Sequence, residues 1–251
     1  MNIPLTEIEI LTSGTAVALA ASGAYAYAGM SPTSQIFGRC LVASRHPRQI
    51  ALTYDDGPND RETPRLLEVL AEQKIRATFF LIGSFARQRP DLVRAIASGG
   101  HLIGNHTLTH PALLLCSAQR VRQELREGST ALEDILGQPV RWFRPPYGAR
   151  RPYVLRVARE LGLNPVLWNA MGYDWKPTTP EAVAAHVWRG FERNQKHGRA
   201  TNVLLHDGGH RGLRQDRSHT IVATRALIAR WRHHFAERGE TCEFVTPEAW
   251  V

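Results

Sequence analysis

The sequence predicts an α/β domain built on a parallel sheet that can close into a barrel of about seven strands. Short apolar runs alternate along the chain with amphipathic stretches of helical spacing, which is typical of parallel strands joined by helical crossovers. The 251 residues suffice for one sizeable core. A hydrophobic content of 43% is ordinary for a globular protein.

The first half of the predicted domain contains three strands and two helices. Residues 49–54 form an apolar run that ends at a polar turn, and residues 63–74 place leucines at helical spacing with Pro64 in the first turn. Gly99-Gly100 is a plausible C-cap for a second helix. In chain order, the predicted elements are strand Gln49–Tyr54, helix Thr63–Lys74, strand Ala77–Ile82, helix Pro90–Ser98 and strand His101–Ile103.

The second half repeats the alternation, without an internal sequence repeat. We expect a domain over residues 49–251, preceded by a connector (32–48) and an Ala/Gly-rich apolar segment (1–31). The remaining predicted strands are Arg141–Arg144, Pro165–Asn169, Thr201–Leu205 and Cys242–Val245, and the remaining predicted helices are Ser117–Leu136, Tyr153–Leu161, Pro180–Arg193 and Thr220–Phe235.

The N-terminal segment contains 20 consecutive uncharged residues, Leu11–Met30, which is long enough to span a bilayer as a helix. Its residues are mostly small, no Lys or Arg precedes it, and Arg39, Arg45 and Arg48 follow it. We expect a membrane anchor or an atypical export signal, which would place the protein in the cell envelope or outside the cell. The alternative is an Ala-rich helix packed on a cytoplasmic domain.

The formal charge is +8, and only Lys74, Lys176 and Lys196 among the 31 basic residues are lysine. No block of like charges marks a basic arm, so we expect a solvated basic surface and no nucleic-acid partner. The three cysteines lie far apart without a CxxC pair. They exclude a disulfide framework and a thiolate zinc site, although one disulfide remains possible.

Polar clusters follow five of the predicted strands: Asp55-Asp56, Asn105-His106, Arg144, Asp174 and His206-Asp207. Side chains at the carboxyl ends of parallel strands converge on one edge of the sheet. The clusters therefore predict a functional site at that edge.

His106 and His110 have the spacing of two ligands on one face, if the segment forms a helical turn. Two unrelated loop histidines are the alternative, and HTLTH lacks the glutamate of the HExxH proteases. Because Asp55 and Asp56 are adjacent, one carboxylate can bind a cation while the other stays free as a base. The alternative interpretation of the pair is a solvated turn. Asp56 with the two histidines would form a facial triad with open positions for water and substrate.

These motifs resemble the polysaccharide deacetylases of the NodB-homology type, carbohydrate esterase family four. The resemblance covers residues 49–245, and the segments ATFF (77–80) and GNH (104–106) support it. The motifs, in chain order, are TYDDGP (53–58), HTLTHP (106–111), RPPYG (144–148), DW (174–175) and LLHD (204–207). The family's fold is an irregular (β/α) barrel with about seven strands, in agreement with the element count.

The resemblance implies a role for each matching residue. Asp56, His106 and His110 would hold one divalent ion. Zinc is the expected ion, and cobalt, nickel or manganese are alternatives.

Asp55 would be the general base, held in place by Arg144 through a charge-assisted hydrogen bond. The backbone N–H of Tyr147 would stabilise an oxyanion. His206, aligned by Asp174, would protonate the leaving amine.

The resemblance also assigns the pocket for the acetyl methyl to Trp175, Leu204 and Pro145. One position departs from the family pattern: Met171 stands where an acidic residue or Asn is frequent. Asp207 is either a supporting group for His206 or a strand-end cap. His210 and His219, in or beside the loop 208–218, are expected at the surface.

The expected function is hydrolysis of the N-acetyl group of N-acetylglucosamine residues in a chito-oligosaccharide or peptidoglycan, by a monomeric enzyme. An O-acetyl esterase acting on xylan and a small-amide hydrolase remain alternatives, because the same groups would serve each reaction. A catalytically inactive glycan- or nucleic-acid-binding module is a further alternative.

Overall fold

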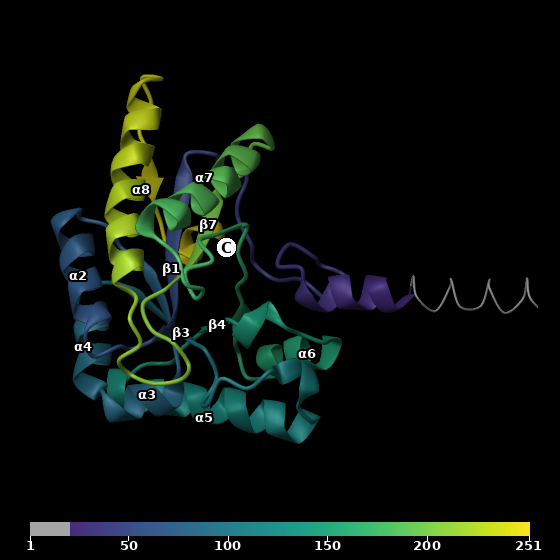
Figure 1. Cartoon of the computed structure of the whole chain (residues 1–251). Coiled ribbons are helices and arrows are strands. Elements are labelled where there is room, and N and C mark those ends of the chain that lie inside the picture. The colour runs from purple at the N-terminus through teal and green to yellow at the C-terminus, as the bar shows by residue number, and fades with distance from the viewer. Residues whose placement is uncertain (1–20) are drawn as a thin grey trace, which may run out of the picture.

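The computed structural model describes residues 21–251, and a sheet of eight strands lies at its centre (Figure 1). Every strand pairing is parallel. The order along the sheet is β5-β4-β3-β2-β1-β7-β6, and β8 pairs with β1. The strands are β1 (Gln49–Gly57), β2 (Thr78–Leu81), β3 (Leu102–Asn105), β4 (Trp142–Phe143), β5 (Asn164–Pro165), β6 (Ala170–Met171), β7 (Thr201–His206) and β8 (Glu243–Phe244). The predicted parallel α/β architecture is confirmed.

The two ends of the sheet, β5 and β6, are joined by the short segment 166–169, which makes the barrel irregular. This segment does not form a regular ladder. Val166 pairs with Leu41 of the connector, and the buried Asn202 amide on β7 donates to the carbonyls of Val42 and Leu167 at 3.0 and 2.7 Å. The predicted single strand Pro165–Asn169 is therefore wrong, because its middle residues bond to these segments between two short strands.

The helices agree with the predicted elements to within a few residues, with one addition. The six-residue α3 was not predicted, since one and a half turns are too short to show a helical period. The helices are α2 (Glu62–Glu72), α3 (Gly83–Gln88), α4 (Pro90–Ser98), α5 (Ala118–Leu136), α6 (Pro152–Glu160), α7 (Pro180–Lys196) and α8 (Ser218–Ala236). Ser117 caps α5 by accepting a hydrogen bond from the Arg120 N–H.

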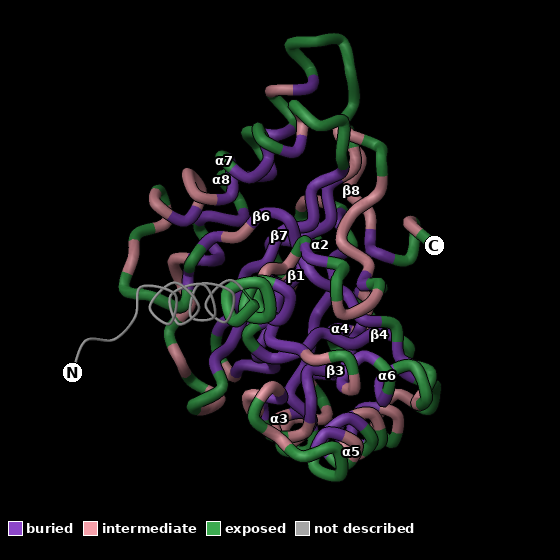
Figure 2. Tube along the Cα trace, turned by 90° about the vertical axis from the view of Figure 1, so that its right-hand side faces the viewer, coloured by how far each residue is buried: buried purple, intermediate pink, exposed green. Residues whose placement is uncertain are grey.

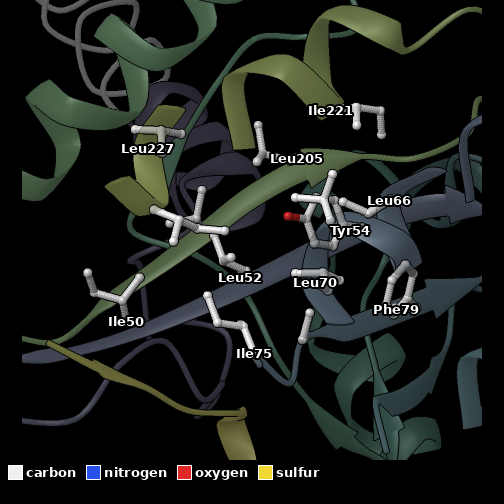
Figure 3. Close-up of a cluster of buried hydrophobic side chains, with 14 of the residues drawn as sticks. Ile50, Leu52, Tyr54, Leu66, Leu70, Ile75, Phe79, Leu205, Ile221 and Leu227 are labelled. Atoms are coloured by element: carbon white, nitrogen blue, oxygen red, sulfur yellow. The ribbon is translucent and has the colours of Figure 1, made fainter. Parts of the chain in front are cut away.

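The largest apolar cluster lies between β1 and the helices α2 and α8 (Figure 3). Ile50, Leu52 and Tyr54 alternate along β1 and point into this cluster. The residues between them, including Thr53 and Asp55, therefore face the barrel interior. This alternation gives β1 two functions, since one face holds the core and the other carries polar groups.

Residues 21–30 form a helix that extends away from the domain (Figures 1 and 2). Residues 21–27 are exposed and only Ala28 and Gly29 are buried, so this part of the segment does not pack on the domain as the alternative required. No helix within residues 21–251 is long and apolar enough to cross a membrane. Residues 11–20 of the predicted apolar segment lie outside the described residues.

The connector 32–48 packs against the domain. The buried Arg150 guanidinium donates to the carbonyls of Ser31 and Ser34, both at 2.8 Å. The three cysteines are free thiols, so no disulfide contributes to this packing.

We predict that Asn202→Ala destabilises the domain by about 1–3 kcal/mol. The substitution removes the hydrogen-bond donor of two backbone carbonyls where the two ends of the sheet meet. Urea unfolding followed by circular dichroism measures this change. Asn164→Ala is the matched control, since the Asn164 amide is exposed. Equal stability of the two variants would contradict the proposed role of Asn202.

Candidate active site

The carboxyl ends of β1, β3 and β7 bring the predicted polar residues together. Asp55 pairs in register with His206, and β3 ends at Asn105, directly before His106. All of these side chains are buried. The convergence expected from the sequence is therefore present at one edge of the sheet.

An irregularity in β1 allows Asp55 and Asp56 to face the same site. The pairing between β1 and β2 shifts register between Asp55 and Gly57, and Asp56 has a φ of 69°. In a regular strand, neighbouring side chains point to opposite faces. The bulge removes this restriction, so that the Asp55 and Asp56 carboxylates lie 3.7 and 3.4 Å from the same His106 Nε2.

The segment from His106 to His110 is a loop, so the helical turn that would place both rings on one face is absent. Thr107 and His110 both have positive φ, 69° and 61°. The Asn105 side chain accepts from the Thr107 N–H at 2.6 Å, and Thr107 Oγ1 accepts from the His110 N–H at 2.9 Å. These local bonds direct both imidazoles to one side, with ring centroids 4.9 Å apart.

Helix α5 supports this loop from behind. The buried Glu124 carboxylate accepts from the Thr109 N–H and hydroxyl at 2.8 and 2.6 Å. The backbone of Thr107 lies so close to Gly128 that a Cβ there would be 2.8 Å from the Thr107 carbonyl carbon. Glycine at position 128 is therefore required for this close approach.

Asp56, His106 and His110 form a group that fits a divalent cation. Their ligand atoms lie within 4.8 Å of one another, and Asp56 Oδ1 is 3.4 and 3.1 Å from the Nε2 atoms of His106 and His110. Since the Arg144 carbonyl takes the Nδ1–H of His106 at 2.8 Å, Nε2 of the neutral ring presents its lone pair. Three buried ligand atoms thus converge where a positive charge would satisfy them.

Electrostatics favour a charged aspartate in this group. Burial alone would raise the pKa of Asp56, but hydrogen bonds with His106 and His110 hold it well below its usual value. Burial lowers the pKa of His110, which favours the neutral ring that a metal requires.

Arg144 lies beneath the site and is fully buried. Its Nη1 donates to Asp55 Oδ1 at 2.8 Å and to Thr53 Oγ1 at 2.7 Å. Its guanidinium carbon lies 4.2 Å from the Phe80 ring centroid. The predicted ion pair between Arg144 and Asp55 is thus present, and it fixes the orientation of the carboxylate.

His206 and Asp174 form a second ion pair in the same site. Asp174 Oδ1 is 2.8 Å from His206 Nδ1, and Asp174 Oδ2 accepts from the His206 N–H at 2.7 Å and from the Thr220 hydroxyl at 2.8 Å. Burial opposes a charged imidazole, but Asp174 outweighs it and raises the pKa of His206 to about 9. His206 is therefore protonated at neutral pH, with Nε2 left free.

A cavity of about 370 Å³ joins these groups. Trp175 and Leu204 line it as predicted, whereas Pro145 does not and Trp168 takes part instead. The other lining residues are Asp55, Asp56, His106, His110, Tyr147, His206, His210, Arg211, Gln215 and Arg217.

Tyr147 sits at the rim of the cavity. Its φ of 59° places it in the left-handed region, and its half-exposed ring contacts His110 with centroids 4.8 Å apart. The Tyr147 ring thus lies beside the metal-ligand group, and the role of its N–H stays a prediction.

Two histidines assigned to the surface have closer connections to the site than the sequence indicated. His210 is exposed, but its ring stacks on His110 at 4.9 Å and 9°. His219 is half-buried and its Nε2 contacts the Asp174 carbonyl at 2.8 Å. The Gly/Arg-rich composition of their loop gave no signal for either contact.

Asp207 lies behind His206 and does not line the cavity. Its side chain accepts from the Thr63 hydroxyl, and burial raises its pKa to about 7. Asp207 therefore links the end of β7 to the start of α2 through a hydrogen bond. This contact favours a structural role for Asp207 over a role in supporting His206.

Comparisons with known proteins agree with these features. A family model described as polysaccharide deacetylase matches residues 43–166. A chitooligosaccharide deacetylase of Rhizobium leguminosarum bv. trifolii is 35% identical, over 74% of this chain and 86% of its own.

Two solved structures are similar in fold. A peptidoglycan N-acetylglucosamine deacetylase superposes with a TM-score of 0.72 at 27% identity, covering 84% of this chain and 92% of that chain. A pseudoenzyme of carbohydrate esterase family 4 from Bacillus anthracis has a TM-score of 0.67 at 26% identity, covering 80% and 65%. Since a pseudoenzyme shares the fold, catalytic activity depends on which residues occupy the site.

We predict that Gly128→Ala weakens zinc binding about tenfold or more, because the added Cβ displaces the loop that presents His106 and His110. Isothermal titration calorimetry measures the affinity. Gly23→Ala is the control, since nothing lies within 4 Å of the Cβ it would add. Unchanged affinity in Gly128→Ala would show that this packing does not position the ligands.

We predict that Asp174→Asn lowers the pKa of His206 from about 9 to its ordinary value or below, because burial then outweighs the weaker attraction of Asp56 and Asp55. An NMR titration of the His206 imidazole measures the change. In the variant, the ring loses its proton before the pH reaches 8. A pKa that stays near 9 would rule out Asp174 as the cause.

Proposed function

Because the chain belongs to the polysaccharide deacetylase family, we propose that it is a metal-dependent hydrolase that removes N-acetyl groups from glycans containing N-acetylglucosamine, with release of acetate. The observation that carries this proposal is the joint presence of a base, an acid and a metal-ligand group in one cavity. A binding module would need none of these three together.

Asp56, His106 and His110 would hold the ion, and zinc is the ion that we expect. When bound, such an ion polarises a carbonyl and makes water more acidic. Asp/His/His also suits cobalt, nickel or manganese.

The base and the acid are assigned by their buried partners. Asp55, oriented by Arg144, accepts a proton from the attacking water. His206, protonated because of Asp174, donates its proton to the nitrogen of the leaving amine. The two groups thus have buried partners of opposite charge, a guanidinium for the base and a carboxylate for the acid.

The rim of the cavity serves binding. The N–H of Tyr147 would donate to the oxygen that gains negative charge as the carbonyl becomes tetrahedral. Trp175 and Leu204 provide apolar surface for the acetyl methyl. The substrate that we propose is a chito-oligosaccharide or a peptidoglycan strand, the two classes named for the similar deacetylases.

We predict that the purified protein releases acetate from chito-oligosaccharides, and that Asp55→Asn reduces kcat by about 10²–10⁴-fold, since a positioned base contributes this much. Asp134→Asn, an exposed aspartate on α5, is the matched control. Chelation should abolish activity, and added zinc should restore it.

Activity that resists both the chelator and Asp55→Asn would overturn this mechanism. Faster acetate release from acetylated xylan than from chito-oligosaccharides would indicate an O-acetyl esterase with the same site. No acetate from any glycan, together with intact zinc binding, would indicate an inactive binding protein.

A further inference from the structure

A groove of about 950 Å³ lies outside the catalytic cavity. Helix α7 forms one side, and Ser31 with the first two residues of the connector, Pro32 and Thr33, lies on another. On α7 the lining residues recur at helical spacing, so they share one face of the helix. They are His186, Arg189, Gly190, Arg193 and Asn194, and His197 lines the groove directly after the helix.

The groove is basic and contains no compensating acid. Lys176, Arg189, Arg193 and Arg199 line it, and no Asp or Glu does. Within residues 21–251, none of these four cations forms an ion pair with a carboxylate. Free guanidinium and ammonium groups in a concave surface create a positive potential that attracts an anion.

A row of aromatic rings connects the groove to the catalytic cavity. The Trp175 ring lies 5.3 Å from His206 and 5.3 Å from Tyr173, and the Tyr173 ring lies 4.9 Å from His186 in the groove. Trp175 and Tyr173 are each more than a third exposed. Trp168 lines both cavities, so the two sites are adjacent.

Two of the cations lie beside the aromatic row and His186. Lys176 Nζ lies 5.5 Å from the Tyr173 ring centroid, and Arg189 Nη2 lies 2.5 Å from His186 Nδ1. Arg193 has a structural task as well, since it donates to the Asn169 carbonyl at 2.7 Å. The side chains of Lys176 and Arg189, by contrast, bond to no backbone atom in the described chain, and both residues are exposed.

From these contacts we propose that the groove binds the carboxylates of an acidic glycan, whose sugar chain crosses Trp175 and Tyr173 while one N-acetyl group enters the catalytic cavity. This inference rests on the proposed function and specifies its substrate as a glycan that carries negative charge. Sugar rings pack their apolar faces on exposed aromatic rings, and guanidinium groups match carboxylates in geometry and charge. A neutral glycan would use the aromatic row without the basic groove.

The experiment compares two substrates, neutral chitotetraose and a tetrasaccharide of alternating N-acetylglucosamine and N-acetylmuramic acid, which carries carboxylates. In Lys176→Glu/Arg189→Glu, we expect KM for the acidic tetrasaccharide to rise about tenfold or more, because like charges then face each other. We expect kcat for both substrates, and KM for chitotetraose, to change by less than about twofold. High salt should raise the wild-type KM for the acidic substrate only.

Arg87→Glu/Arg126→Glu is the matched control, with the same charge change on exposed residues of α3 and α5, far from α7 (Figure 1). An equal rise of KM in this control would overturn the inference, because net charge alone would then explain the effect. Thermal melting of both variants verifies that they fold.

The failure of this inference differs from the failure of the proposed function. An unchanged KM for the acidic tetrasaccharide, with acetate still released, overturns the groove as a glycan site only. Loss of sedimentation with phosphatidylglycerol vesicles in Lys176→Glu/Arg189→Glu, at unchanged KM, would overturn it in favour of a lipid surface. No acetate from either substrate contradicts the proposed function itself.

Discussion

The buried Arg144 guanidinium is the group on which the rest of the site depends. Its side chain holds Asp55 and its backbone carbonyl holds the His106 ring, so one residue positions both the base and a metal ligand. Since β4 contains only two residues, the position of Arg144 depends on these contacts and on the Phe80 ring. Removing one member of a buried ion pair typically costs about 3–5 kcal/mol, because the other charge is left without compensation. The stability of the barrel interior and the geometry of the site are thus set by the same interaction.

Two buried ion pairs supply the proposed base and the proposed acid of the site. Arg144 pairs with the base Asp55, whereas Asp174 pairs with the acid His206. Both arrangements are possible because parallel strands end side by side, and Asp55 and His206 are register partners on β1 and β7. The fold therefore places the proposed base and acid close together, each oriented by a buried partner of opposite charge. This division argues that the chain is suited to catalysis, although a pseudoenzyme shares its architecture.

Beyond the strand ends, exposed aromatic and basic side chains extend the site toward α7. The aromatic row from His206 through Trp175 and Tyr173 leads toward α7. There lie the basic side chains that form no ion pair with a carboxylate in the described residues. The high arginine content, which the sequence presented as a solvated basic surface, thus includes a concave region beside the catalytic cavity. A polymer bound there would contact the protein well beyond the acetyl group that reacts. Substrate selection and bond cleavage would then depend on different residues.

The sequence by itself determined the alternation of strands and helices, the parallel sheet and most residues of the site, including Asp55, Asp56, His106, His110, Arg144, Asp174 and His206. The sheet and the helices follow from local periodicity, and the site residues follow from polar clusters at strand ends together with the resemblance to the deacetylase family. Tertiary structure alone decided that His106 and His110 converge from a loop and not from a helical turn, and that Trp168 lines the cavity in place of Pro145. It also decided that the exposed His210 stacks on His110 and that Asn202 joins the sheet ends. The physical reason is that loop dihedrals and side-chain directions depend on contacts between segments distant in sequence, such as the approach of Gly128 to Thr107, which no local pattern records.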